Sequence, residues 1–118
     1  MNAVDAATLG KLHHDIGGDA TTIRELTDAF FRQTPKLLED ARAAAARGDQ
    51  APVHRAAHTL KSSALLFGAA RLADLSRALE SDSESALPPR APARVAALAE
   101  EYGRVERDLR AWLEGYQK

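Results

Sequence analysis

The C-terminal segment of the chain carries the pattern that most constrains its fold. Its apolar residues recur at alternating spacings of three and four positions, and they are Val95, Leu98, Tyr102, Val105, Leu109, Trp112 and Tyr116. This spacing aligns them along one side of an α-helix, and it is typical of a helix that packs in a bundle. We therefore predict a helix over about residues 93–116 whose apolar stripe is covered by other helices.

The rest of the chain supplies these partner helices. Helical periodicity recurs in four earlier segments, whereas no run of alternating apolar and polar residues indicates a strand. The four segments are about residues 5–16, 19–47, 50–67 and 69–83. Candidate N-caps are Asp5, Asp19 and Asp49, and the candidate stops are Gly17-Gly18, Gly48 and Gly68. We predict an all-α fold, an antiparallel four-helix bundle with a short extra N-terminal helix, in a single domain over residues 1–118.

Two proline-containing stretches modify this picture. Pro35 falls inside segment 19–47, where its missing amide and its clash with the preceding turn predict a kink near Phe31–Thr34. A split into two helices is the alternative. Residues 81–92 are rich in Ser and Pro, so we predict the long loop of the chain there.

The charge balance bears on the classes of partner. Sixteen basic and seventeen acidic residues give a net charge of -1, so we expect neither nucleic acid nor a membrane surface as partner. The sequence has no cysteine, no apolar segment near the roughly 18 residues of a membrane span, and no signal-peptide pattern. We therefore expect a cytoplasmic protein. Its 118 residues suffice for one modest core rather than a large enclosed active site.

Segment 50–67 combines a packing stripe with an unusual outer face. The apolar residues of the stripe are Ala56, Ala57, Leu60, Ala64 and Phe67. On a neighbouring stripe the same helix carries His58, Lys61, Ser62 and Leu65, because residues three and four apart are neighbours on a helix surface. An imidazole with an ammonium one turn later, among small residues, is an odd outer face for a purely structural helix.

The string His58-Thr59-Leu60-Lys61-Ser62-Ser63, with Gly68 ten residues after the histidine, resembles the core motif of histidine-containing phosphotransfer (HPt) domains. That motif reads His-x-(Leu/Ile)-Lys-Gly-(Ser/Ala). The resemblance covers nearly the whole chain, and its further elements are Gly17-Gly18-Asp19, Phe30-Phe31, Pro35 and Gly48-Asp49. One departure is plain, because Ser62 stands where the family usually has glycine.

The resemblance implies a role for each residue of the motif. His58 would accept a phosphoryl group, and Lys61 would lie beside the phosphoryl oxygens. Glu80, 22 residues after the histidine, would accept a hydrogen bond from Nδ1 and leave Nε2 as the nucleophile. Supporting positions are Ser62, Ser63, Gly68 and Arg77. The alternatives are that Glu80 is an ordinary solvated glutamate and that Arg77 is a solvated surface residue rather than a partner of Glu80.

The residues beside the motif predict a surface for partner docking. His54 and Leu65 would belong to it, and Leu65 could form an exposed apolar patch with Leu9 or Leu12. Burial of Leu65 in the core is the alternative. His54 and His58 are four apart, but the sequence shows no third zinc ligand, so we expect no metal site. His13 and His14 are interpreted as solvated surface residues.

By this resemblance the chain is a phosphorelay intermediate. It would accept a phosphoryl group from the aspartate of one response-regulator receiver domain and pass it to another. We expect a monomeric carrier with no cofactor of its own, because Mg²⁺ would belong to the receiver. The sequence contains no nucleotide-binding motif, so autokinase activity is not expected. The alternative is a helical adaptor that binds a receiver or another partner without phosphotransfer.

Overall fold

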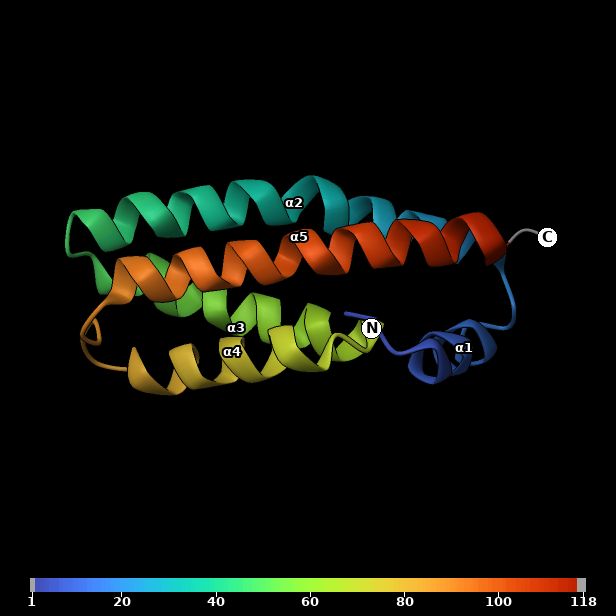
Figure 1. Cartoon of the computed structure of the whole chain (residues 1–118), viewed down its shortest axis with the longest axis horizontal. Coiled ribbons are helices and arrows are strands. Elements are labelled where there is room, and N and C mark those ends of the chain that lie inside the picture. Colours follow the sequence, from blue (N-terminus) through green and yellow to red (C-terminus); the bar gives the residue numbers. More distant parts are fainter. Residues whose placement is uncertain (1, 117–118) are drawn as a thin grey trace.

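The fold consists of helices and the loops between them (Figure 1). A computed structural model describes residues 2–116, and within that range it contains no strand. The helices are α1 (Ala6–Asp15), α2 (Ala20–Ala46), α3 (Gln50–Phe67), α4 (Ala70–Asp82) and α5 (Ala91–Tyr116). The predicted all-α fold is confirmed, and the predicted bounds differ from these by at most two residues.

The four long helices run antiparallel to their neighbours and form a closed bundle (Figure 1). Helix α3 packs between α2 and α4, and α5 packs against both α4 and α2, so each long helix has two neighbours. Helix α1 packs against α3 at one end of the bundle. The elongated shape, 47 × 24 × 21 Å, follows from helices of up to 27 residues lying side by side.

The predicted apolar stripes form the core. The spaced residues of α5 from Val95 to Leu109 are buried, while Trp112 and Tyr116 are partly buried and Leu113, which the spacing did not predict, takes a core position. Three aromatic rings from α2, α3 and α5 meet in this core. The Phe30 ring lies 4.9 Å from that of Phe67 and 5.3 Å from that of Tyr102, measured between centroids. Burial of such large side chains is the main driving force for closing the bundle.

The helix starts differ in how they are capped. The Asp5 carboxylate accepts from the amides of Ala7 and Thr8, and that of Asp19 accepts from the amide of Thr21, as predicted for N-caps. Asp49 holds the N-cap position of α3, but its side chain makes no capping hydrogen bond. The predicted cap is therefore wrong in this detail, because the Asp49 carboxylate instead pairs with Arg47 at 3.3 Å.

Pro35 and Pro92 both lie within helices, and the kink near Phe31–Thr34 stays a prediction. Helix α2 continues from Ala20 to Ala46 through Pro35, so the alternative of two separate helices is wrong. Helix α5 begins at Ala91 rather than at residue 93. Pro92 is then the second residue of α5, where the amide has no partner within the helix and its absence costs little. The long loop shrinks accordingly to residues 83–90.

Gly68 joins α3, α4 and α1. Its φ of 72° lies in the left-handed region, and the amide of Ala69 closes the end of α3 by donating to the Ala64 carbonyl at 2.8 Å. The Gly68 carbonyl accepts from the amide of Asp5 at 2.9 Å. A β-carbon at this position would lie 2.7 Å from Cβ of Thr8. Glycine is thus required both by the turn and by the close approach of α1.

Candidate functional site

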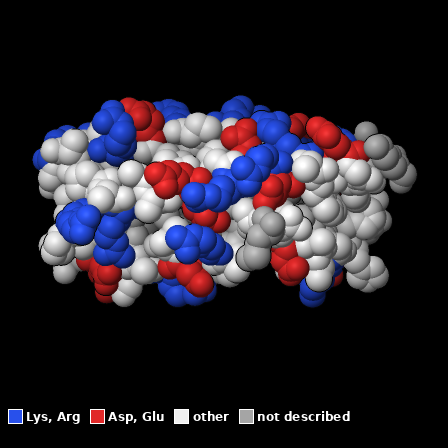
Figure 2. Space-filling model, viewed as in Figure 1, with Lys and Arg blue, Asp and Glu red and all other residues white. Residues whose placement is uncertain are grey.

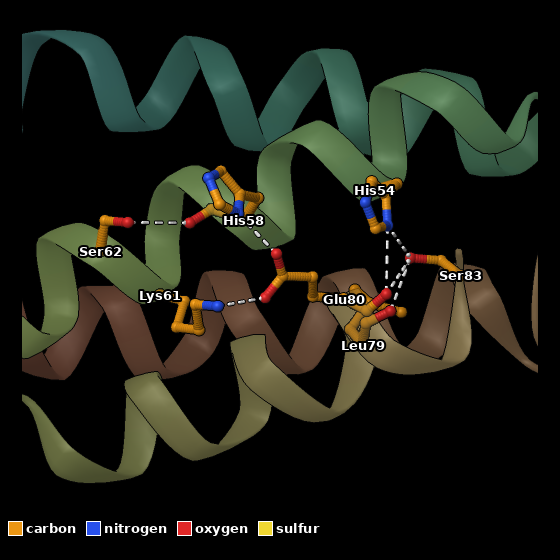
Figure 3. A network of polar contacts seen from close by, with 7 residues as sticks. All are labelled: His54, His58, Lys61, Ser62, Leu79, Glu80 and Ser83. Carbon is orange, nitrogen blue, oxygen red and sulfur yellow. Dashed lines mark hydrogen bonds and ion pairs between the residues drawn. The ribbon is translucent and has the colours of Figure 1, made fainter.

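The candidate site lies on the seam between α3 and α4. The buried stripe of α3 faces the core and includes Ala56, Ala57 and Leu60. Because that stripe fixes the rotation of α3, His58 and Lys61 emerge on the side next to α4 (Figure 3). Glu80, in the last turn of α4, extends its carboxylate between them. The packing of the core therefore brings together three residues that the sequence resemblance had selected.

The Glu80 carboxylate contacts both partners at once. Its Oε2 lies 2.5 Å from Nδ1 of His58, and its Oε1 lies 2.6 Å from Nζ of Lys61. The His58 side chain is 62% exposed, whereas those of Lys61 and Glu80 are 26% and 16% exposed. An ionised carboxylate can only accept hydrogen bonds, so Nδ1 of His58 is the donor. In the neutral ring this leaves Nε2 unprotonated, on a side chain that solvent reaches.

The same contacts favour the ionised form of Glu80. The hydrogen bond from Lys61 is the largest cause that lowers the pKa of the Glu80 carboxyl below its ordinary value, and the hydrogen bond from His58 is the next. Partial burial acts in the opposite direction but is outweighed. Glu80 is therefore a carboxylate at neutral pH, as the assigned direction of the His58 hydrogen bond requires.

His54 contacts the end of α4. Its Nδ1 is 3.1 Å from the carbonyl oxygen of Glu80 and 3.3 Å from Oγ of Ser83, and its ring is partly buried against the end of α4 (Figure 3). The ring is therefore engaged with the end of α4, and a place for His54 at a docking rim stays a prediction. A signal was available: His54 precedes His58 by about one turn, and Ser83 follows Glu80 by about one turn on the antiparallel partner.

The supporting residues divide into those near His58 and those directed away. Oγ of Ser62 bonds to the carbonyl of His58, one turn back on α3, at 3.4 Å, so the hydroxyl lies along the helix rather than over the ring (Figure 3). Ser63 is partly buried on the same helix. Arg77 pairs with Asp74 at 3.1 Å and not with Glu80, so the suggested Arg77–Glu80 pair is wrong.

Two neighbouring leucines are exposed on α3. Leu65 is 53% exposed and Leu66 is 41% exposed, so the alternative that placed Leu65 in the core is wrong. The predicted patch does not include α1, because Leu9 and Leu12 are buried. Leu65 follows His58 by two turns on the same side of α3. The exposed apolar surface is thus next to the histidine but smaller than predicted.

The remaining histidines are separate from the site. His14 is exposed, as expected, but His13 packs edge-on against the ring of Tyr116, with 4.8 Å between centroids. The solvated interpretation of His13 is therefore wrong, and the tertiary contact with α5 could not be read from local spacing. Among residues 2–116 there is no group of three or more His, Cys, Asp and Glu side chains placed to hold a metal ion.

A closed antiparallel bundle with an exposed, carboxylate-bound histidine on one helix defines the class of helical phosphotransfer domains, and the comparisons agree. A family model, Hpt domain, matches residues 25–108, which include His58, Lys61 and Glu80, so the chain belongs to the HPt family. The solved structure of histidine-containing phosphotransfer protein B (HptB) from Pseudomonas aeruginosa PAO1 superposes with a TM-score of 0.82. The match covers 97% of this chain and 96% of that chain at 24% identity, and it supports the fold.

No curated protein matches the chain. Membership of the HPt family gives the chain a phosphotransfer role in two-component signalling, in which such domains interact with receiver domains. Within the described residues no helix is long and apolar enough to cross a membrane. Basic and acidic side chains are interspersed on the face shown in Figure 2, in keeping with a net charge of -1.

Proposed function

We propose that the chain is a phosphorelay intermediate that carries a phosphoryl group on Nε2 of His58. The group would come from the phosphorylated aspartate of one receiver domain and pass to the aspartate of another. One observation carries this proposal: His58 is exposed while its Nδ1 is held by Glu80 at 2.5 Å. That arrangement leaves a lone pair on Nε2 available to a partner protein.

The proposed chemistry uses the Nε2 lone pair. Nε2 attacks the phosphorus of the aspartyl phosphate, the bond between phosphorus and the aspartate oxygen breaks, and the aspartate leaves as a carboxylate. The ring gains positive charge as the nitrogen–phosphorus bond forms, while the proton stays at Nδ1. The Glu80 carboxylate next to Nδ1 stabilises this charge, and the reverse sequence returns the group to a second aspartate.

Lys61 and the surroundings of His58 fit the arriving phosphoryl group. Glu80 takes one hydrogen bond from Nζ of Lys61, and an ammonium has three protons to donate. Lys61 can therefore keep Glu80 and also donate to a phosphoryl oxygen. Mg²⁺, in this proposal, is held by the acidic site of the receiver. Leu65 and Leu66 supply the apolar contact for receiver docking, and the carrier acts as a monomer.

The first prediction concerns His58 itself. We expect wild-type protein to take up acid-labile, base-stable label from a radiolabelled, phosphorylated receiver domain, and His58→Gln to take up none. The matched control is His14→Gln, which alters an exposed histidine on α1 and should label like wild type. Receiver binding, measured by calorimetry, should persist in His58→Gln because glutamine keeps the surface polar and similar in size.

Two other results would contradict the proposal, and the first of them supports the alternative of a helical adaptor. If several receivers bind wild-type protein but leave it unlabelled, the chain binds its partner without phosphotransfer. If His58→Gln is labelled as well as wild type, the phosphoryl acceptor is another residue and the proposed role of His58 is wrong.

A further inference from the structure

The last turn of α4 is tied to α3 by side chains that precede His58. Nε2 of Gln50 donates to the carbonyl of Ser83 at 2.5 Å, and Nδ1 of His54 lies 3.1 Å from the carbonyl of Glu80. Gln50, His54 and His58 are spaced four residues apart, so they line one side of α3. The backbone and the carboxylate of Glu80 are thus both held from this side of α3, at successive turns.

The contacts fix the tautomer of His54. A carbonyl oxygen can only accept, so the proton of the His54 ring lies on Nδ1. The neighbouring hydroxyl agrees with this assignment: Oγ of Ser83 donates to the Leu79 carbonyl at 2.6 Å, which leaves its lone pairs to face Nδ1 of His54 at 3.3 Å. Ser83 is fully buried, so its hydroxyl is shielded from competing water.

The Glu80 carbonyl that His54 contacts lies at the C-terminal end of α4. α4 ends at Asp82, two residues after Glu80, and the last carbonyls of a helix have no partner within it. Helix ends fray unless other groups satisfy those carbonyls. The amide of Ser83 donates to the Leu79 carbonyl at 3.0 Å but lies 3.4 Å from that of Glu80. The Glu80 carbonyl is therefore closer to Nδ1 of His54, at 3.1 Å, than to the amide of Ser83.

We propose that His54 is a positioning residue for His58: by donating Nδ1–H to the Glu80 carbonyl it holds the last turn of α4, and so keeps the Glu80 carboxylate on Nδ1 of His58. The contribution to phosphotransfer rests on the proposed function. The effect on Glu80 and His58 does not, because it is a property of the chain alone. His54 acts here through α4, with no contact to the phosphoryl group.

The test compares two substitutions that differ in one hydrogen-bond donor. His54→Leu removes the donor, whereas His54→Asn places an amide nitrogen near the position of Nδ1. His14→Leu is the matched control, because it removes an exposed histidine from a different helix, α1. Long-range ¹H–¹⁵N spectra at about pH 8.5, where ordinary histidines are neutral, report the tautomer of each ring. The signals of His58 are assigned from their absence in His58→Gln.

We expect His58 to be one tautomer, protonated on Nδ1, in wild type, in His14→Leu and in His54→Asn. In His54→Leu the two tautomers should mix, and the amide of Ser83 should exchange with solvent about fivefold faster, the factor set by one ordinary hydrogen bond. Transfer from a phosphorylated receiver should slow in His54→Leu and recover in His54→Asn. If wild type fails to accept the phosphoryl group, the proposed function is wrong. The His58 tautomer spectra would then still test whether His54 positions Glu80.

Three outcomes would overturn the inference. The His58 tautomer could be unchanged in His54→Leu, or the Leu and Asn variants could behave alike, which would show that the donor is irrelevant. The third outcome is measured on wild-type protein, so it does not depend on whether a variant folds. If its spectrum shows the His54 proton on Nε2, then Nδ1 cannot donate to the Glu80 carbonyl.

Discussion

Glu80 is the residue on which the contacts of the site converge. Three side chains of α3 contact it: His54 at the backbone carbonyl, His58 at Oε2 and Lys61 at Oε1. The two carboxylate contacts stabilise the ionised form, because both lower the pKa of Glu80. Charge and geometry are therefore coupled here, since loss of the Glu80 charge weakens the contacts to His58 and Lys61 together.

Glu80→Gln separates the charge from the hydrogen bond. The folded pKa of Glu80 lies below its ordinary value of 4.5, so the charged carboxylate stabilises the fold above that pH and loses its contribution as the pH falls through the folded pKa. We expect Glu80→Gln to be less stable than wild type at pH 7 and the difference to shrink in acid. Urea unfolding between about pH 3 and 7 measures it. The His58 tautomer should persist, because the glutamine oxygen still accepts from Nδ1.

Glu100→Gln is the control for this series. Glu100 is exposed on α5 and forms no ion pair within the described part of the chain. The unfolding free energy of Glu100→Gln should stay close to that of wild type at every pH. A Glu80→Gln difference that is the same at pH 3 and pH 7 would show that the Glu80 charge contributes nothing to stability.

At this scale the sequence predicted some residues and missed others for a physical reason. Family resemblance pointed to the His58–Glu80 contact, and the structure has the two side chains 2.5 Å apart. The contact of His54 depends on where the backbone of α4 ends relative to α3, which local spacing does not encode. Arg77 likewise pairs with Asp74 rather than with Glu80, although both acids are three residues from it on α4, because the two Glu80 oxygens are taken by His58 and Lys61 of α3.

The elements were predicted well because their signals are local. Apolar spacing, aspartates before the helices and glycines after them gave α1 to α5 to within two residues. The error at Asp49 concerns a side chain, because its carboxylate pairs with Arg47 instead of capping α3. Helix α2 is one helix through Pro35, as predicted, because packing of its apolar stripe outweighs one lost hydrogen bond. Only the structure shows why glycine is needed at residue 68, since the neighbouring Thr8 is 60 residues away in sequence.

Gly68→Ala should destabilise the whole bundle. The methyl group would meet Cβ of Thr8 at 2.7 Å, and the φ of 72° is strained for alanine. Strain and displacement of α1 together should cost about 2–4 kcal/mol of unfolding free energy. Urea unfolding monitored by circular dichroism measures this loss. The matched control is Gly48→Ala, because Gly48 has a similar φ of 78° and no atom within 4 Å of an added β-carbon.

The control should cost about 1 kcal/mol, the price of a left-handed alanine alone. Equal losses of unfolding free energy at the two positions would show that α1 moves away from the added methyl group at no cost. The close approach of α1 to Gly68 would then contribute nothing to stability. A smaller loss at Gly68 than at Gly48 would contradict the contact with Thr8 outright.

At the scale of the molecule, the bundle follows from the number and amphipathic character of the helices. The stripe of α5 needs cover on two sides, and α2 and α4 provide it, so antiparallel closure was predictable. The outer surface was less predictable. Leu9 and Leu12 are spaced like residues that could join a docking patch, yet α1 turns them onto α3. Which apolar residues stay exposed is decided by how the helices pack. Among the large apolar side chains of residues 2–116, Leu65 and Leu66 are the exposed ones.

Leu65→Arg should therefore weaken receiver binding without unfolding the bundle. Leu65 is 53% exposed on the side of α3 that carries His58, so its replacement removes little core packing. A partner that covers His58 would also cover Leu65, which lies two turns, or about 10 Å, farther along α3. Loss of a buried leucine contact and burial of a charge should raise the Kd about tenfold or more. Calorimetric titration with a receiver domain measures the change.

Ala46→Arg is the matched control, because it adds the same charge at an exposed position at the end of α2. The control should bind like wild type if the receiver docks across the α3–α4 seam. Equal weakening in both variants would indicate a general charge effect rather than a docking surface. Unchanged binding in Leu65→Arg, with His58→Gln still unlabelled, would mean that the receiver approaches His58 from the N-terminal end of α3, over Arg55, which is exposed on that helix.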